Sequence, residues 1–339
     1  QGMDPTVMNG AVMKNFATSD ALFASALVGK GEVFVSEVDE SDGSIARYNP
    51  TVAVINNIAL DHKTMDELRV LFEGFARRAE VAVLNDENDE TSQLNLKLLG
   101  DGETAEHDVV SFSLDGGMSE FTASDIRPGP TQISFRAHDA EDGRQTADVT
   151  LRMPGVHNVY NALAAIAAVT RLGVKFEDAC ASLEKFEGIK RRFDIVGTSA
   201  NNVTVIDDFG HNPDKISATL RTLHDFPGRL IVMFQPHGFG PLRKMKDEFV
   251  ETFVKGLSDE DVLLMPQPVY FGGTVDRSVT SKDLTDEIAA AGKRAETQET
   301  RVDCGDRIVE LVKPDDRIVV MGARDDTLSE FAADVLSRV

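Results

Sequence analysis

The sequence is poor in cysteine and in long apolar runs, and each shortage excludes a class of protein. Its 339 residues include only two cysteines, Cys180 and Cys304, which give neither a disulfide framework nor the spacing of a Cys-type metal site. No apolar stretch approaches the roughly 20 residues that a membrane span requires. No charged-then-apolar leader of the secretory type opens the chain. We therefore expect a protein of the reducing cytoplasm.

Positive charge is also scarce. The sequence has 35 lysines and arginines against 57 aspartates and glutamates, a formal net charge of −22. A negative net charge of this size repels the phosphate backbone of nucleic acids, so we predict no nucleic-acid partner. It also disfavours an anionic membrane surface. A small anionic substrate stays compatible with this charge, because a local cluster of basic residues can outweigh the global field. The composition gives no indication of the oligomeric state.

The length and the hydrophobic pattern predict two α/β domains. A chain of 339 residues with 42% hydrophobic content is long enough to bury two cores. Short β-branched runs end in polar clusters and alternate with helical patterns, which is typical of parallel strands buried on both faces. Alternating residues between 107 and 152 indicate a smaller antiparallel patch. We expect parallel strands at residues 33–35, 52–55, 81–84, 203–206, 230–234, 262–265 and 318–321.

A domain boundary is expected between Gly188 and Arg192, because the strand–helix alternation restarts beyond it. We predict an α/β protein in which residues 3–188 form a central, mostly parallel sheet domain with a small antiparallel patch. Residues 189–339 are predicted to form a Rossmann-like, doubly wound C-terminal domain.

Polar side chains follow these apolar runs at the point where each predicted strand ends. In open parallel sheets, ligands bind outside the carboxyl ends of the strands. No single one of these residues is a specific signal, but their shared position predicts a site. The candidates are Glu37, Asp39, Glu40, Asp61, His62, Asp207, Asp208, His211, His237 and Asp325.

The acidic run from Glu37 to Asp42 allows two interpretations. Such a run is most often a solvated loop. The alternative is a magnesium site, because Mg²⁺ usually takes one or two protein carboxylates together with substrate phosphates. His62 likewise fits either an ordinary loop residue or a ligand. Both alternatives stay open on the residues alone.

Two further segments combine an ordinary and a functional interpretation. In residues 155–165 the asparagines fit a close-packed alanine helix, but His157, Asn158 and Asn161 also crowd one helix start. Free N–H groups there bind anions or nucleotides. The basic cluster Lys190–Asp194 is either a solvated linker or a phosphate clamp at the domain junction, since guanidinium groups match phosphate oxygens.

Taken in order, these segments resemble the motifs of the Mur ligase family. None of them would suffice alone, but their order and spacing match the alanine-adding branch of the family better than the others. The resemblance covers essentially the whole chain. The set is EVDESD (37–42), NIALDH (57–62), GVHNVYNALAA (155–165), GIKRRFD (188–194), DDFGHNP (207–213), FQPH (234–237) and GARD (322–325).

The resemblance implies an ATP-dependent amide ligase of peptidoglycan precursor synthesis. ATP would phosphorylate the carboxylate of UDP-N-acetylmuramate to an acyl phosphate. The amine of an amino acid, L-alanine for this branch, would then displace the phosphate. Mg²⁺ and basic groups would neutralise the charge on the transferring phosphoryl group. The implied cofactors are ATP and Mg²⁺, and the implied partners are UDP-N-acetylmuramate and an amino acid.

The resemblance also assigns roles to individual residues. The implied metal ligands are Glu37, His62 and, with less support from the motif, Glu40. The implied nucleotide-binding residues are His157, Asn158, Asn161, Asp207 and Asp208, with Arg191 or Arg192 on the ATP phosphates. His211 would face the uridine-linked substrate, and His237 the incoming amino acid. The implied catalytic residues are His62, Arg192 and His211.

The chain departs from the family at specific positions. It contains no G-x-x-x-x-G-K-[ST] loop, and Gly29-Lys30-Gly31 is not one. Because the family uses that loop to cradle phosphates, we expect a truncated chain that is inert by itself. Gly238 and Pro241 stand where the alanine-adding branch has arginines, and Phe209 where a tyrosine is common. The amino-acid specificity is therefore open.

Competing interpretations are a catalytically inert Mur-like binding module and a ligase of the peptide-recycling type. A metal-dependent phosphohydrolase that uses Glu37, Asp39 and His62 is weaker, because it leaves Arg192, Asn158 and His237 unexplained. A dinucleotide dehydrogenase is weaker still, since no G-x-G-x-x-G follows a predicted strand.

Overall fold

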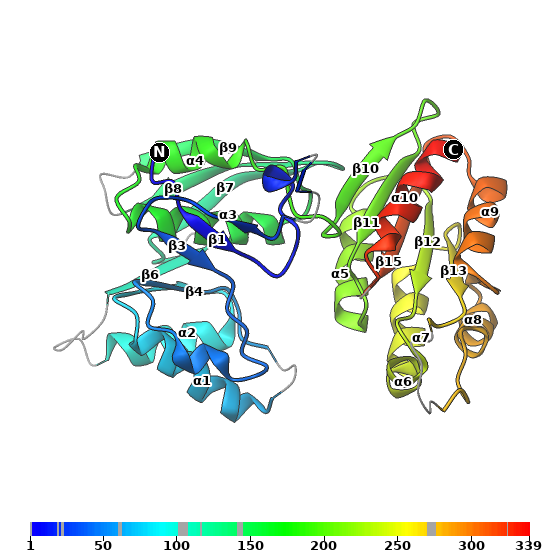
Figure 1. Cartoon of the computed structure of the whole chain (residues 1–339), viewed down its shortest axis with the longest axis horizontal. Coiled ribbons are helices and arrows are strands. Elements are labelled where there is room, and N and C mark those ends of the chain that lie inside the picture. The colour runs from blue at the N-terminus through cyan, green and yellow to red at the C-terminus, as the bar shows by residue number, and fades with distance from the viewer. Residues whose placement is uncertain are drawn as a thin grey trace. The chain divides into compact units, whose positions relative to one another are not determined.

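The computed structural model describes residues 2–18, 20–21, 24–59, 63–100, 108–115, 117–140, 145–269, 276–323 and 325–339. The chain divides into two compact units, Gln1–Gly188 and Ile189–Val339. Each unit is built around a mostly parallel sheet with helices on both faces (Figure 1), so the predicted α/β fold class is confirmed. Within the described ranges, no helix has the length and apolar character needed to cross a bilayer.

The first unit contains a six-stranded sheet in the order β4-β5-β6-β7-β8-β9. Strands β4 to β7 run parallel, and β8 and β9 add antiparallel pairs at one side, which is the predicted antiparallel patch. The turn at Gly129 is closed by its N–H, which donates to the carbonyl of Gln132. The strands are β4 (Val52–Ile55), β5 (Val81–Asn85), β6 (Asp108–Ser113), β7 (Phe121–Pro128), β8 (Ile133–Asp139) and β9 (Gln145–Leu151).

Helices cover both faces of this sheet, because successive side chains of each strand point to opposite sides. On β5, Ala82 and Leu84 pack with α1 (Met65–Arg77) and α2 (Asp89–Leu99). Val83, between them, packs with α3 (His157–Thr170) and α4 (Phe176–Leu183). Figure 1 shows α1 and α2 on one side of β4 and β6 and α3 on the other.

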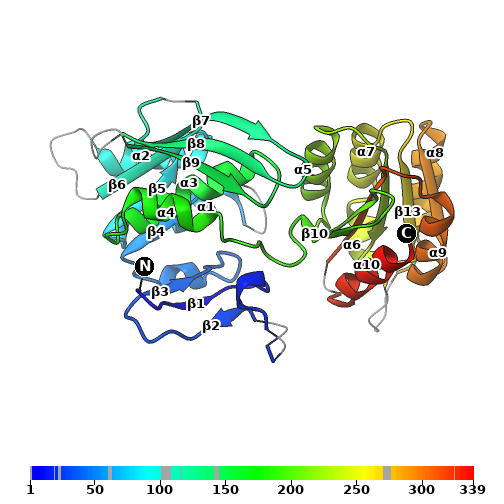
Figure 2. The same ribbon diagram turned by 90° about the horizontal axis from the view of Figure 1, so that it is seen from above.

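Strand β3 (Phe34–Ser36) differs from the prediction. It does not join the central sheet but forms a small sheet with β1 (Thr6–Met8) and β2 (Ala26–Leu27), in the order β2-β1-β3 (Figure 2). Phe34 is 58% and Val35 49% exposed. The expectation of a buried strand at residues 33–35 was wrong, because neither side chain belongs to a core cluster of the unit. Short 3₁₀ turns lie at Lys14–Phe16 and Ser44–Arg47.

The second unit has a six-stranded sheet in the order β10-β11-β15-β12-β13-β14. All its strands are parallel except β10, which runs antiparallel to β11. The crossover from β11 to β12, with β15 between them, produces the predicted doubly wound arrangement. The strands are β10 (Asp194–Thr198), β11 (Thr204–Asp208), β12 (Leu230–Gln235), β13 (Val262–Pro266), β14 (Arg294–Gln298) and β15 (Arg317–Gly322).

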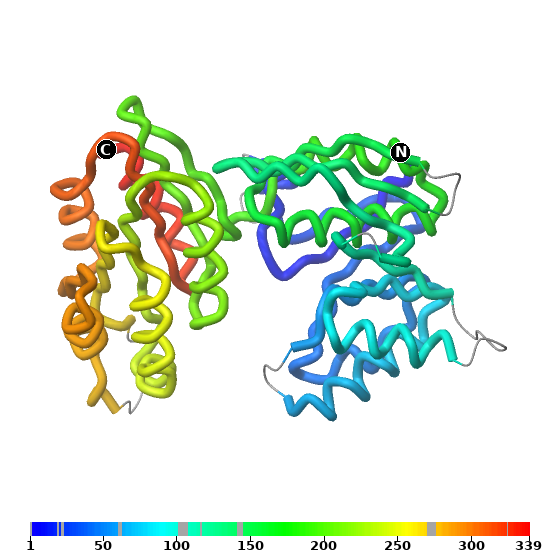
Figure 3. The backbone as a smooth tube through the Cα atoms, turned by 180° about the vertical axis from the view of Figure 1, so that it is seen from behind, coloured from blue at the N-terminus to red at the C-terminus, as the bar shows by residue number. Residues whose placement is uncertain are grey.

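Two separate apolar cores lie on the two faces of this sheet. One core packs against α5 (Pro213–His224), α6 (Phe239–Lys244), α7 (Lys246–Gly256) and α8 (Ser281–Ala290). The other packs against α9 (Arg301–Leu311) and α10 (Thr327–Arg338). The tube in Figure 3 follows the chain through both groups of helices. Met245 (φ −114°) separates α6 from α7.

Candidate functional site

Three neighbouring strands of the second unit end at one edge of the sheet and carry three of the predicted motifs. β15 pairs in parallel with both β11 and β12; Asp208 lies opposite Met321, and Gln235 lies opposite Gly322. The segments that follow these strands therefore leave the sheet at a common edge, where open parallel sheets bind ligands. These segments include Phe209–Asn212, Pro236–Gly238 and Asp325.

Arg191 and Arg192 are adjacent in sequence but lie in opposite environments. Arg191 is 5% exposed; its Nη2 donates to the carbonyl of Gly322 (2.5 Å) and its Nε to Oδ1 of Asp207 (3.5 Å). Arg192 is exposed. The resemblance left open which arginine would contact phosphate. The side chain of Arg192 therefore faces solvent, whereas that of Arg191 makes its hydrogen bonds inside the fold.

The side chain of Asp207 is enclosed beneath the loop that carries Arg191 and Arg192. Its side chain is 1% exposed and accepts hydrogen bonds from Ser329 Oγ (2.6 Å) and from Arg191. Burial raises the pKa of Asp207, although the donors Ser329 and Arg191 act in the opposite direction. Both carboxylate oxygens of Asp207 therefore already accept hydrogen bonds from side chains of the chain itself, Oδ1 from Arg191 and Oδ2 from Ser329. A contact of Asp207 with the nucleotide stays a prediction.

Asp208 fixes the same loop from its other side. Its Oδ1 accepts from the backbone N–H of Phe193 (2.9 Å), and its Oδ2 from the N–H of Gly210 (3.1 Å) and the hydroxyl of Thr219 (2.8 Å). Asp208 is buried. Its hydrogen bonds connect the loop Arg191–Phe193 (the arginine loop), the turn after β11 and helix α5. Its predicted contact with the nucleotide also stays a prediction.

An unbroken series of ring contacts runs along this edge. The guanidinium carbons of Arg191 and Arg192 lie 5.1 Å and 5.0 Å from the centroid of the Phe209 ring. The ring centroids of Phe209 and His211 lie 5.3 Å apart, and those of His211 and His237 5.6 Å apart, with each pair of rings nearly perpendicular. His211 Nδ1 lies 3.0 Å from the carbonyl oxygen of Phe209. The structure thus brings together the predicted residues Arg192, His211 and His237.

A second polar network, which the sequence reasoning missed in part, lies beside these rings. The amide of Gln235 donates to Asp325 Oδ2 (2.8 Å), and Arg301 Nη1 donates to the same oxygen (3.0 Å). Arg301 Nη2 also donates to Thr327. Burial works to raise the pKa of Asp325, but the hydrogen bonds from Thr327 and Gln235 outweigh it and the pKa is lowered. Nothing in the sequence singled out Arg301 as a site residue, because it stands at the start of α9 outside every motif.

The asparagines predicted for nucleotide binding form a series of amide contacts in the first unit. Asn158 Nδ2 donates to the carbonyl of Pro154 (2.7 Å), and Asn161 Nδ2 lies 3.4 Å from Asn158 Oδ1. Asn161 Oδ1 accepts from Asn56 Nδ2 (2.5 Å). Asn158 is buried, whereas His157 and Asn161 are exposed. Asn56 joins the set because β4 ends beside the first turn of α3, a proximity that the sequence spacing does not reveal.

Tyr160 and Glu87 add a neighbouring contact that was not predicted. The phenol of Tyr160 donates to Glu87 Oε2, while Oε1 accepts from the backbone N–H groups of Leu114 (2.8 Å) and Asp115 (2.7 Å). Burial and the nearby Glu87 raise the pKa of Tyr160. The pair connects helix α3 to the segments that follow β5 and β6.

The candidate metal ligands are only partly within the described residues. Glu37 follows β3, is exposed, and accepts the N–H of Gly10 on Oε2 (2.6 Å). Glu40 is half-buried in the following turn; Asp61 and His62 lie outside the described residues. In the part of the chain that the structure describes, no three His, Cys, Asp or Glu side chains gather as a metal site. A single exposed carboxylate still suits Mg²⁺, which takes few protein ligands.

Two glycine positions bear on the departures from the family. Gly238 has φ +140° and ψ 158°, a conformation that residues with a side chain rarely adopt. Arg243, a cation further along α6, is paired with Asp276. A Cβ on Gly31 would lie 1.8 Å from the carbonyl oxygen of Met3. Gly31 is therefore required for close backbone packing.

Comparisons with known proteins agree on one family. Residues 12–169 match the Mur ligase middle domain, and residues 191–324 match the Mur ligase, glutamate ligase domain. The UDP-N-acetylmuramate–L-alanine ligase of Geotalea daltonii is 32% identical over 331 residues, which cover 95% of this chain and 68% of that protein. The ligase of the same name from Agrobacterium fabrum is 35% identical and covers 96% of this chain and 68% of that protein. The chain thus spans about two-thirds of the length of these relatives (68%).

Solved structures give the same result. UDP-N-acetylmuramate–alanine ligase MurC from Thermotoga maritima has a TM-score of 0.75 at 26% identity and covers 99% of this chain and 69% of that one. A murein peptide ligase from Psychrobacter arcticus has a TM-score of 0.64 at 23% identity, over 100% of this chain and 72% of that one. The second likeness supports the fold alone.

Proposed function

Because the chain belongs to the Mur ligase family of ATP-dependent amide ligases, we propose that it is the part of a peptidoglycan precursor ligase that joins L-alanine to UDP-N-acetylmuramate. The observation that carries the proposal is the gathering of Arg192, His211 and His237 at the carboxyl edge of the second unit's sheet. The choice of L-alanine is supported by relatives named for that activity at 32% and 35% identity.

The proposed reaction has two steps. The substrate carboxylate attacks the γ-phosphorus of ATP, which forms an acyl phosphate and releases ADP. The amino-acid amine then attacks the carbonyl carbon, expels inorganic phosphate and loses a proton. Both steps concentrate negative charge on phosphoryl or carbonyl oxygens, so fixed cations stabilise their transition states. We assign this role to Arg192, because its guanidinium is exposed and held over an aromatic ring.

The two histidines are assigned to the substrates. His211 would face the uridine-linked substrate, and His237 the incoming amino acid. Neutral imidazole accepts a proton near pH 7, which suits a group close to an attacking amine. In the first unit, Asn158, Asn161 and His157 would hold the nucleotide, with Asn56 as a further contact. The described contacts of Asp207 and Asp208 support a role in holding the arginine loop.

Glu37, together with Glu40 and His62, would hold Mg²⁺. The support is chemical: the carboxylate of Glu37 is exposed at the end of β3, and Mg²⁺ prefers few protein oxygens plus phosphate oxygens. When bound, the ion would neutralise the phosphate charge and orient the γ-phosphoryl group.

A second candidate is a Mur-like binding module without turnover. It is favoured by the absence of a G-x-x-x-x-G-K-[ST] motif from the sequence, because that loop supplies backbone N–H groups and a lysine to the phosphates. We propose that the 339-residue chain by itself does not turn over ATP. A peptide-recycling ligase is the third candidate, because Gly238 stands where the alanine-adding branch has an arginine.

The deciding experiment measures phosphate release from ATP with UDP-N-acetylmuramate and Mg²⁺, for the 339-residue chain and for the product of the complete gene. The acceptors are a panel of single amino acids and a tripeptide. Alanine-dependent release that His62→Ala abolishes would support the proposal. Phosphate release with the tripeptide alone would identify a ligase of the peptide-recycling type instead. A folded complete protein without release for any acceptor would refute the ligase assignment.

A further inference from the structure

We propose that Phe209 is a positioning residue, which holds the guanidinium group of Arg192 in place to meet an anionic phosphate group. The ring also separates the tasks of the two neighbouring arginines, so that Arg191 anchors the loop and Arg192 is presented outward. The phosphate as ligand rests on the proposed function. The placement of Arg192 by the ring does not.

The first support is the geometry of the ring. Phe209 is half-buried between the arginine loop and His211, and both guanidinium carbons lie within about 5 Å of its centroid, at 5.1 Å for Arg191 and 5.0 Å for Arg192. A cation at this distance over an aromatic face is attracted by the negative face of the ring. An aliphatic side chain of similar size fills the space but has no such charge distribution. The position therefore requires a ring.

The second support is the difference between the two arginines. Arg191 is buried and is tied to Gly322 and Asp207. Arg192 is exposed, and the described contacts of its side chain include the ring at 5.0 Å. A long exposed side chain loses rotamer freedom when it binds a ligand. A ring that already restrains Arg192 lowers this loss, so the phosphate meets a cation that is in place.

The third support is the rigidity of the backbone beneath the ring. Arg191 (φ +60°) and Phe193 (φ +49°) both adopt left-handed conformations, which cost a non-glycine residue free energy and persist only where the surroundings fix them. Here the N–H of Phe209 donates to the carbonyl of Arg191 (2.7 Å), and the N–H of Phe193 donates to Asp208 (2.9 Å). Asp208, the last residue of β11, and Phe209 directly after it thus both fix the loop that carries the arginine.

The test uses NMR of the arginine side chains in the 339-residue chain. The ring current of Phe209 should shift the Nε–H resonance of Arg192 away from the position of an exposed arginine. Phe209→Leu should remove this shift, and Phe209→Tyr should keep it. Phe331→Leu is the matched control, because Arg301 lies 5.5 Å from that ring. An Arg192 resonance that is the same with phenylalanine and leucine would overturn the proposal.

The functional arm measures kcat and the KM for ATP in the complete protein. We expect Phe209→Leu to lower kcat/KM about 3- to 30-fold, since one cation–π contact corresponds to such a factor. Phe209→Tyr should restore kcat/KM to within about 2-fold, by the same reasoning. An unchanged kcat/KM in a folded Phe209→Leu protein would refute the role toward phosphate. If the complete protein has no turnover, the ligase assignment fails, and the NMR arm still decides whether Phe209 places Arg192.

Discussion

At the scale of single residues, the adjacent arginines Arg191 and Arg192 should differ strongly in how much stability the same substitution costs. Arg191→Met removes a buried cation beside Asp207, so the free energy of unfolding should fall by about 3 kcal/mol, as for other broken buried pairs. Arg192→Met should change it by less than about 0.5 kcal/mol, because exposed side chains contribute little to stability. Urea denaturation of both variants measures this difference. Equal losses would show that the assignment of the anchoring role to Arg191 is wrong.

Asp207 should give the fold an unusual pH dependence. Since burial raises its pKa in the folded chain, the neutral form is favoured by folding. Its contribution to stability is therefore complete below the unfolded pKa of about 3.9 and is lost as the pH rises through the folded pKa. The difference in unfolding free energy between the wild type and Asp207→Asn should decrease from about pH 4 upward. Urea denaturation between about pH 4 and pH 8 tests this. A difference that grows with pH would indicate that the ion pair with Arg191 dominates instead.

Gly238 is a position where the backbone itself limits the side chain. Its φ of +140° makes Gly238→Arg strained, and we expect a loss of about 1–3 kcal/mol in unfolding free energy. Introducing the arginine of the alanine-adding branch should therefore not improve alanine use in the ligase assay. Gly240→Arg is the control, because a Cβ there meets nothing within 4 Å. A Gly238→Arg protein of unchanged stability and higher alanine turnover would contradict this view of the turn.

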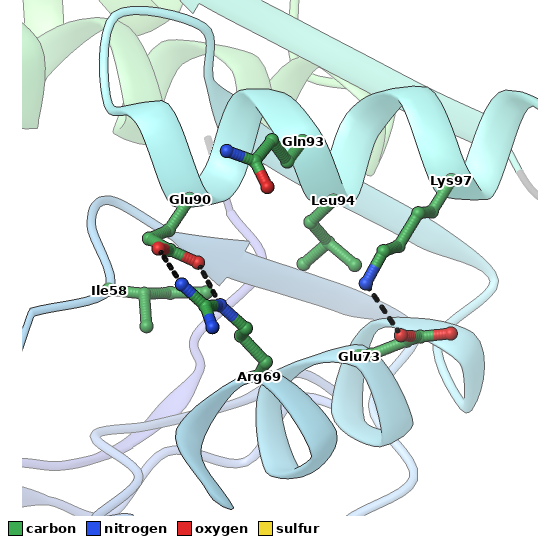
Figure 4. A pocket seen from close by; sticks show the side chains of 7 residues that line it. All are labelled: Ile58, Arg69, Glu73, Glu90, Gln93, Leu94 and Lys97. Carbon is green, nitrogen blue, oxygen red and sulfur yellow. Dashed lines mark hydrogen bonds and ion pairs between the residues drawn. The ribbon is translucent and has the colours of Figure 1, made fainter. Parts of the chain in front are cut away.

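At the scale of helices and strands, α1 and α2 are joined by ion pairs over an apolar contact (Figure 4). Arg69 contacts Glu90, Glu73 contacts Lys97, and Leu94 packs between the helices. Leu94 is 5% exposed, so Leu94→Ala should cost about 2–5 kcal/mol through the cavity that it leaves. Arg69→Ala should have a small effect that added salt reduces further, because surface ion pairs are screened. Denaturation at low and high salt compares the two. A large, salt-independent loss for Arg69→Ala would contradict this ranking.

The elements also show where sequence reasoning succeeds. The apolar runs predicted β5 and β12, because a pattern along one segment determines its own structure. The polar strand β14 (Arg294–Gln298) was missed, since it lies at the sheet edge and needs no apolar run. β3 was predicted with the wrong burial, because the pattern does not say which sheet a strand joins.

The residues of the candidate site likewise divide into those that the sequence predicted and those that it did not. Arg192, His211 and His237 were predicted, because each stands directly after an apolar run or in a basic cluster. Arg301 and Asn56 were missed, because each enters its network through a partner distant in sequence, Asp325 for one and Asn161 for the other. The roles of Phe209 and Arg191 also required coordinates, since burial alone separates the two arginines.

At the scale of the whole chain, each unit has its own cores, which assigns the effect of a core substitution to one unit. Leu94 belongs to a cluster within Gln1–Gly188, and Leu220 to one within Ile189–Val339. Leu220→Ala should lower the hydrogen-exchange protection of β11, β12 and α5, and Leu94→Ala that of β4, β5 and α1, with each loss equivalent to about 2–5 kcal/mol. Native-state exchange followed by mass spectrometry resolves the two sets of segments. Loss of protection across both units from either substitution would show that they unfold as a single cooperative body, and stability effects measured at Arg191 or Asp207 would then report on the entire chain.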